Sequence, residues 1–266
     1  MNVWIFKNKF FSYCLYVIFL MAFTEAAGAA SRPFVNFQSL DGSLYFFDHN
    51  RVDPRRTFST AVDAWGDYSI GDLYAYGTWQ TALNNDYQGA KSSYYYKFIP
   101  RLSLGKNIDK DISWGIFKVT SLALWVSRTR GQGASYFPGL AMDWQLPGLD
   151  WFRTIYYFEH NDKKGWNDQR LHLDFGSVFS TDIGDFRIAG TYDMTFGQGR
   201  NPVMIDFKPE LHYDLGKSLG YAPRHLWIGA VINPVKNKYK IQDTPAFRTN
   251  QFRYGFMVRY SFSIVK

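Results

Sequence analysis

The chain has 266 residues and a formal net charge of +7, and its 30 Lys and Arg are interleaved with 23 Asp and Glu. Nucleic-acid binding needs a basic patch or stripe, so we expect no nucleic acid partner. Aromatic residues make up 20% of the chain although the mean hydropathy is slightly negative. Beyond the N-terminal segment, no apolar run reaches the about 18 residues that indicate a transmembrane helix.

The N-terminal segment has the pattern of a secretory signal peptide. Lys7 and Lys9 precede the apolar run 10–23, and Ala-Gly-Ala at 27–29 is a cleavage motif. The apolar run is shorter than the about 20 residues of a membrane-spanning helix. We therefore expect residues 1–29 to be removed on export.

The single cysteine, Cys14, lies inside this segment. It follows Tyr13, where a lipoprotein signal needs a small residue, so we do not expect a lipid anchor. The remaining domain, residues 30–266, would contain no cysteine. Neither a disulfide framework nor a thiolate metal site is then available to it.

Twelve segments have the pattern of β-strands. In chain order they are 34–47, 57–66, 70–80, 93–104, 114–127, 138–146, 150–160, 168–180, 185–196, 202–214, 225–235 and 249–264. The clearest is 202–214, where apolar residues such as Phe207 and Leu211 alternate with ionisable ones such as Lys208 and Glu210. A period of two places the two sets on opposite faces of a strand. The first, third and fifth segments alternate poorly, so counts of ten or fourteen strands stay open.

These strands favour a transmembrane antiparallel β-barrel of about 12 strands. Most are long enough for the about 9–11 residues of a tilted membrane strand, and an even count is typical of bacterial single-chain barrels. Alternation would also explain why so many aromatic residues form no long apolar run. The alternative is an exported all-β sandwich, which would carry fewer outward aromatic residues because its outer faces meet water.

The connections are consistent with this topology. If both termini lie in the periplasm, connections after even-numbered strands should be short and those after odd-numbered strands longer. The short turns are 66–69, 147–150 and 181–185, and the longer loops are 48–56, 81–92, 128–137, 160–168 and 235–249. The rule holds for eight of eleven connections, and the departures are 105–113, 197–202 and 215–224.

Two prolines, Pro100 and Pro209, lie inside predicted strands on the apolar register. Proline cannot donate to the hydrogen-bond ladder and is expected at edges or bulges. Because a closed barrel has no edge, we predict a local bulge at each.

A series of segments resembles the Tsx/OmpK family of nucleoside-specific channels in the Gram-negative outer membrane. The segments are YYYKFIPRLSLGKNIDKDISWGIFK, LPGLDWFRTIYYFEH, GWNDQRLHLDFGSVFS, DFRIAGTYD, MIDFKPELHYDLGKS and HLWIGAVINPVKNKYKIQ. The resemblance runs from about Thr57 to the C-terminus. It implies a monomeric twelve-stranded barrel whose narrow pore, lined by aromatic and ionisable side chains, passes nucleosides.

The chain departs from the family pattern at three places. Ile99 precedes Pro100 where members usually carry an acid, and Thr78 stands where they often carry another. Phe262 is followed by SIVK, whereas outer-membrane strands commonly end on an aromatic residue. The missing acids bear on solute specificity and leave the expected fold unchanged.

The ionisable residues on the polar register are the candidates for lining the pore. They are Arg101, Asp143, Arg170, His172, Asp174, Arg187, Asp193, Asp206, Lys208, Glu210, His212, Arg253 and Arg259. Such groups can hydrogen-bond ribose hydroxyls while aromatic faces stack on a base, at about 1–3 kcal/mol per stack. Alternatively, opposite charges cross-link neighbouring strands and close the lumen.

Signals for catalysis are weak. His172 and Ser177 face opposite sides of a predicted strand, and His212 lies between Glu210 and Asp214 on a polar face, which is more typical of a lining residue than of a base. No calcium loop and no His/Glu metal spacing is present. We expect no enzyme activity, no metal and no cofactor.

The predicted outer loops are rich in cations, namely Arg51, Arg55, Arg56, Arg128, Arg130, Lys163, Lys164, Lys236, Lys238 and Lys240. They serve solubility or bind lipopolysaccharide phosphates, for which Arg forks are well suited. Our first expectation is an outer-membrane channel for nucleosides or similar small polar solutes, acting as a monomer. The alternatives are a closed barrel that serves as a structural, phage-binding or partner-binding surface protein, and, third, an outer-membrane hydrolase.

Overall fold

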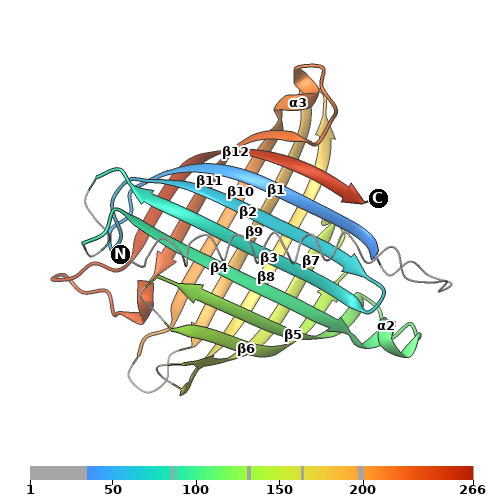
Figure 1. Ribbon diagram of the computed structural model, residues 1–266, viewed down its shortest axis with the longest axis horizontal. Coiled ribbons are helices and arrows are strands. Elements are labelled where there is room, and N and C mark those ends of the chain that lie inside the picture. The colour runs from blue at the N-terminus through green and yellow to red at the C-terminus, as the bar shows by residue number, and fades with distance from the viewer. Residues whose placement is uncertain are drawn as a thin grey trace, which may run out of the picture.

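The computed structural model describes residues 35–84, 87, 89–130, 133–162, 165–196 and 201–265. The expected signal peptide, residues 1–29, lies outside this part of the chain. The described residues form one closed antiparallel barrel in which each strand pairs with its sequence neighbours and the first pairs with the last (Figure 1). Its strands are β1 (Val35–Asp48), β2 (Thr57–Tyr68), β3 (Gly71–Ala82), β4 (Ser92–Ser103), β5 (Phe117–Thr129), β6 (Ala134–Trp144), β7 (Trp151–Asn161), β8 (Gly165–Thr181), β9 (Gly184–Phe196), β10 (Met204–Asp214), β11 (Leu226–Lys236) and β12 (Gln251–Val265).

All twelve predicted strands are present, and the closed sheet confirms the barrel over the sandwich. The largest differences are at strand ends. β6 begins at Ala134 and β8 at Gly165, so both strands start inside segments predicted to be long loops, 128–137 and 160–168. Arg128, assigned to a loop from sequence, is therefore an exposed residue of β5.

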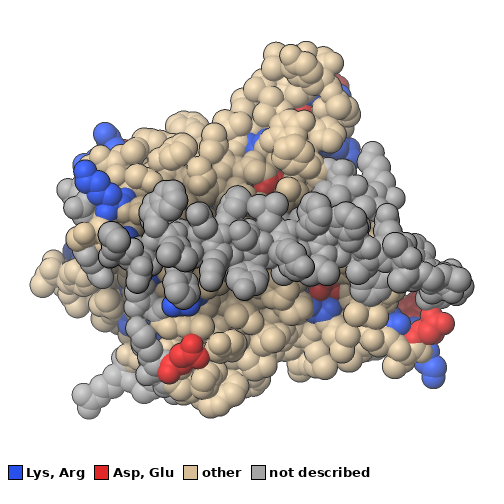
Figure 2. Space-filling model, in the orientation of Figure 1, with Lys and Arg blue, Asp and Glu red and all other residues tan. Residues whose placement is uncertain are grey.

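The residues that alternate along each strand form the inner and the outer face of the barrel. In β10, Glu210, His212 and Asp214 are buried, whereas Leu211 between them is exposed. In β12 the exposed residues are Phe252, Tyr254, Phe256, Val258, Tyr260 and Phe262. Such a row would promote association in water and suits the lipid-facing band of a membrane barrel. In Figure 2, most of the surface above and below the grey band is tan, with only a few charged residues between the two ends.

The predicted bulges at the prolines were wrong. Pro100 pairs with Leu73 and Pro209 with Gly190, and the register is the same on both sides of each. The ladder between β10 and β11 keeps one register from Asp206 to Glu210, across Pro209. Each proline therefore interrupts the backbone hydrogen bonds to one neighbouring strand, and no extra residue is inserted into its own strand. Glycine suits the position opposite Pro209, because a Cβ on Gly190 would lie 2.8 Å from the Phe175 ring.

The connections divide the barrel into two ends. β1 begins and β12 ends at what we call the turn end, which also carries the tight turns after β2 and β8 (Figure 1). Two of the predicted departures from the length rule lie here and contain short helices, α2 (Leu104–Ile108) and α3 (Leu215–Ser218). The opposite, or loop, end carries the long β11–β12 connection with the 3-10 turn η2 (Lys238–Lys240). No helix in the described part of the chain is long and apolar enough to cross a membrane.

Aromatic and aliphatic side chains share the interior with the charged ones. One cluster comprises Ile99, Ala123, Trp125, Phe137, Ala141, Ile155 and Tyr157, with Tyr74 and Tyr95 packed against it. A second comprises Tyr45, Phe47, Ala61, Val231 and Met257, with Tyr76 against it. Apolar packing thus fills part of the lumen on two sides.

Candidate functional site

The thirteen candidate residues all lie on strands with their side chains on the inner face. Arg101, His172, Glu210, His212 and Arg259 are buried. Six others, Asp143, Arg170, Asp174, Arg187, Asp193 and Lys208, keep between 16% and 25% of their side-chain surface exposed. Asp206 and Arg253 are half-buried. The inner face is therefore reached by solvent along part of its surface.

Near the turn end, five residues form a continuous ion-pair chain across β3, β4, β6, β7 and β8, which we call the Arg101 chain. Arg101 donates to Asp72 at 2.7 Å and to Asp143 at 2.8 Å. Arg153 donates to the same Asp143 at 2.6 Å and lies 3.5 Å from Asp174. Three carboxylates thus surround two guanidinium groups, and only 2% of the Arg101 side chain is exposed. This arrangement ties strands together and engages all three guanidinium nitrogens of Arg101 with carboxylates.

A second set of contacts centres on Glu210, and we call it the Glu210 cluster. Its carboxylate lies 2.8 Å from Lys208, 3.0 Å from His212 and 3.4 Å from Arg259, and it accepts from the Tyr45 hydroxyl at 3.4 Å. His212 is 0% exposed, so its ring cannot touch a solute or serve as a base for one. Lys208, which also lies 4.7 Å from the Tyr45 ring centroid, is the most exposed ion of the cluster.

Arg187, Arg253 and Asp206 have looser surroundings. Arg187 lies 4.0 Å from Asp41 and has a buried Nε without a hydrogen-bond partner in the described part of the chain. Arg253 donates to Asn233, which in turn donates to Asp206. Asp41 also lies 3.9 Å from Arg259, so Arg187 is linked to the Glu210 cluster, whereas the contacts of Arg253 and Asp206 described here join neither set.

The fourth group lies around the indole of Trp125. The Lys97 ammonium is 4.9 Å from the Trp125 ring centroid and 5.0 Å from that of Tyr74. The Arg170 guanidinium is 4.8 Å from the same Trp125 centroid and 4.7 Å from that of Phe137. We call Lys97, Trp125 and Arg170 the Trp125 site.

The carboxylate closest to the Trp125 site is already engaged. Asp193 lies 3.0 Å from His172 and 4.0 Å from Arg170, the limit of an ion pair. Arg170 Nε is buried without a hydrogen-bond partner in the described residues. Within the same part of the chain, the Lys97 ammonium has ring contacts and neither an ion pair nor a hydrogen bond.

Several interior ions were missed by the sequence analysis: Asp41, Asp63, Asp72, Lys97 and Arg153. Asp41 and Asp72 lie in strands whose alternation is weak. Lys97 shares its register with Arg101, four residues on, and that spacing was the signal that could have found it. Its neighbours are aromatic on both faces, which hides the alternation.

Two of the three positions at which the chain departs from the Tsx/OmpK pattern face inward, those where an acid was expected. Ile99 is buried in the aromatic cluster beside Trp125, and Thr78 is buried on β3. Acids at these two positions would have pointed into the lumen. Their absence makes this wall of the barrel less negative.

At the loop end, the β11–β12 connection reaches across to other parts of the barrel. Lys238 pairs with Asp53 of the β1–β2 loop, and the Tyr239 hydroxyl donates to the same carboxylate at 2.7 Å. Lys240 pairs with Asp168 of β8. Burial alone would raise the pKa of Asp53, but the Lys238 ammonium and the Tyr239 hydroxyl hold it below its usual value. The connection therefore narrows this entrance.

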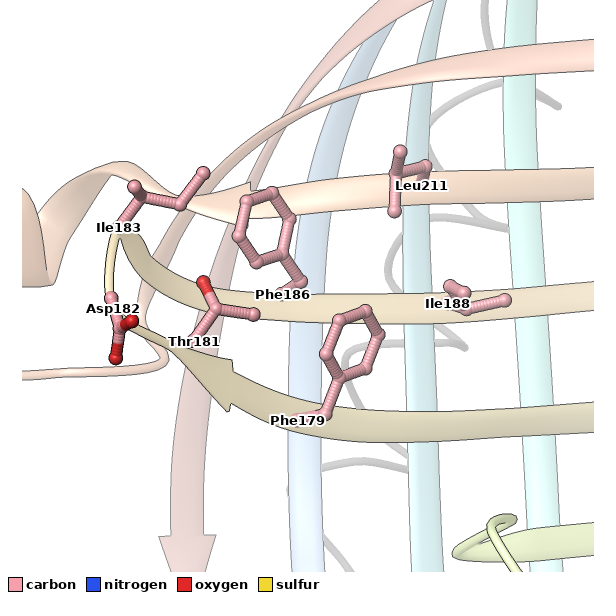
Figure 3. Close-up of a pocket in the computed structure, with 7 residues that line it drawn as sticks. All are labelled: Phe179, Thr181, Asp182, Ile183, Phe186, Ile188 and Leu211. Carbon is pink, nitrogen blue, oxygen red and sulfur yellow. The ribbon is translucent and has the colours of Figure 1, made fainter.

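A groove of about 590 Å³ lies outside the lumen, on the outer surface of β8, β9 and β10 beside the turn end (Figure 3). Its lining residues are Phe179, Thr181, Asp182, Ile183, Phe186, Ile188 and Leu211. Ile188 and Leu211 belong to the exposed outer face. The groove therefore faces lipid and is not part of the candidate site. No group of three His, Cys, Asp or Glu in the described part of the chain is placed to hold a metal ion.

No protein-family model matches the chain, and no curated protein matches its sequence. Solved structures do match. The NanC porin aligns with a TM-score of 0.51 at 9% identity, covering 82% of this chain and 98% of the porin. The KdgM porin in complex with disordered oligogalacturonate aligns with a TM-score of 0.49 at 13% identity, covering 84% and 99%. The chain thus has the fold of an outer-membrane porin.

Proposed function

We propose that this protein is an outer-membrane channel through which nucleosides or similar small polar solutes diffuse passively. The observation that carries the proposal is a closed barrel with an exposed apolar outer face and an inner face of partly exposed ions and aromatic rings. Export by a signal peptide at residues 1–29 and function as a monomer belong to the same proposal.

The inner face offers the chemistry that a nucleoside would use. Side chains such as Lys208 and Asp193 present charged hydrogen-bonding groups for ribose hydroxyls, and rings such as Tyr76 offer faces for a base. Each stack contributes about 1–3 kcal/mol. Several weak sites in series let a solute enter and leave, as conduction requires.

The test is single-channel conductance of the purified protein in planar bilayers during titration with adenosine, with a neutral sugar as control. Small openings that adenosine blocks and the sugar does not would support a nucleoside pore. Openings indifferent to adenosine would leave a channel without that specificity.

A second candidate is a barrel with a closed lumen that acts as a structural or partner-binding surface protein. The Arg101 chain and the buried rings of Phe137 and Tyr157 favour it, because they fill one wall of the lumen with fixed contacts. A verified folded barrel that shows no openings would support this candidate over the channel.

We also propose that cations at the loop end bind the phosphates of lipopolysaccharide. Arg128 is exposed on β5, and Arg130 follows directly after that strand. The double variant Arg128→Glu/Arg130→Glu should reduce lipopolysaccharide co-purification. Unchanged co-purification would reject the idea.

A further inference from the structure

We infer that the Trp125 site binds the phosphate or carboxylate group of an anionic solute inside the lumen. The inference rests on the proposed channel function and deepens it, because it names the charge of the preferred solute. It starts from an imbalance on the wall formed by β4, β5 and β8, where two cations contact one indole ring and, in the described part of the chain, a carboxylate reaches ion-pair distance of Arg170 but not of Lys97.

The positive charges of this site are incompletely neutralised. The Asp193 carboxylate lies 3.0 Å from the His172 ring and 4.0 Å from the Arg170 guanidinium. Lys97 is held by the rings of Trp125, Tyr74 and Tyr76, at 4.9, 5.0 and 5.8 Å. Ring faces attract a cation and fix its position, but they supply no oxygen that accepts its hydrogen bonds.

The N–H donors that have no acceptor indicate which chemical group the Trp125 site binds. An ammonium has three N–H donors and a guanidinium five. Neither the Lys97 nor the Arg170 side chain makes a hydrogen bond in the described part of the chain, and 16% of the Arg170 side chain is exposed. Oxygen atoms of a phosphate or carboxylate are the acceptors that such donors bind best. A neutral nucleoside offers only hydroxyls and base edges and would leave the charge unbalanced.

The location suits passage of such an anion. Lys97 is near the middle of β4, and 16% of the Arg170 side chain is exposed to the lumen. The partly exposed rings of Tyr74 and Tyr76 next to Lys97 give the rest of the solute a surface for stacking. The site therefore favours a small organic anion with a ring over a bare inorganic one.

The experiment compares AMP with adenosine, two probes that differ by the phosphate. Binding to the purified protein is measured by calorimetry, and ion selectivity is measured as the reversal potential in a KCl gradient. The variants are Lys97→Gln, Arg170→Gln and the conservative Lys97→Arg. The control is Lys118→Gln, which removes one positive charge from an exposed position on the same strand as Trp125.

We expect the unmodified protein to be anion-selective and to bind AMP at least about tenfold more tightly than adenosine, as loss of one charge-assisted hydrogen bond implies. Lys97→Gln and Arg170→Gln should each remove most of that preference, Lys97→Arg should retain it, and Lys118→Gln should not change it. Circular dichroism establishes that each variant is a folded barrel.

The possible outcomes distinguish the anion-binding site from the channel function. Openings with equal affinity for AMP and adenosine, or a preference unchanged in both Gln variants, overturn the anion site and leave the channel standing. AMP binding that depends on Lys97 in a protein without openings overturns the channel and supports the site. Absence of both binding and openings rejects both.

Discussion

The Arg101 chain and the Trp125 site occupy the same wall of the barrel and use the same kinds of cation, yet their charges are stabilised in different ways. Arg101 lies between two carboxylates at hydrogen-bonding distance. Lys97 and Arg170 lie over rings, and the carboxylate that reaches Arg170, that of Asp193, is already engaged by His172. An interior ion that pairs with carboxylates on other strands helps to hold the barrel together. A cation that is held by ring contacts keeps its N–H donors available to a solute.

The largest effect should come from breaking the Arg101 chain. Arg101→Gln leaves Asp72 without its arginine and Asp143 with Arg153 alone, and breaking a buried pair costs about 3–5 kcal/mol. The measurement is the free energy of unfolding in urea. Lys97→Gln, which breaks no ion pair, should cost less than about 1 kcal/mol. A larger loss for Lys97→Gln than for Arg101→Gln would reverse the roles assigned to the two groups.

A smaller effect is expected from Asp193→Asn, which removes the carboxylate shared by His172 and Arg170. The Trp125 site becomes more positive, and a Coulomb term of about 1 kcal/mol should strengthen AMP binding roughly fivefold. Calorimetry with AMP and adenosine measures the change. Stronger binding of adenosine by the same factor would mean that the variant opened the lumen and did not alter its charge.

A higher salt concentration should weaken the Trp125 site more than the Arg101 chain. Raising KCl from about 0.1 M to about 1 M shortens the Debye length from about 10 Å to about 3 Å. The partly exposed Trp125 site should lose anion selectivity, so the permeability ratio measured from reversal potentials should approach one. The unfolding free energy assigned to the buried Arg101 chain should change little. Selectivity that persists at high salt would place its source in the pore radius and not in these cations.

The smallest effect concerns a third kind of ion pair, that between Lys238 and Asp53 at the loop end. The pKa of Asp53 is lower in the folded protein than in the unfolded chain. The stabilisation is therefore complete above the ordinary Asp value of about 4 and is lost only as pH falls through the lower folded value. Conductance should stay constant between about pH 8 and pH 5. A step near pH 6 would show that another group controls this entrance.

The fold was predictable because each face of each strand meets one environment. The β10 segment alternates clearly, since lipid and lumen demand different residues. The interior was only partly predictable. Lys97 lies between two aromatic residues and Arg153 follows two, because both faces of these strands use rings, so alternation does not reveal these ions. The pairing of carboxylates with cations depends on the register between strands. That register cannot be predicted from the sequence of any single strand.

The pairing of β1 with β12 has a consequence for how the protein reaches its membrane. Phe46 of β1 lies opposite Phe256 of β12, near the other end of the chain. The barrel cannot be sealed until the last strand has been synthesised, and contacts of such high sequence separation form slowly. An unpaired strand edge is not tolerated in lipid. Insertion must therefore follow synthesis of the whole chain, and until then the open edges of β1 and β12 need to be kept from pairing with other molecules.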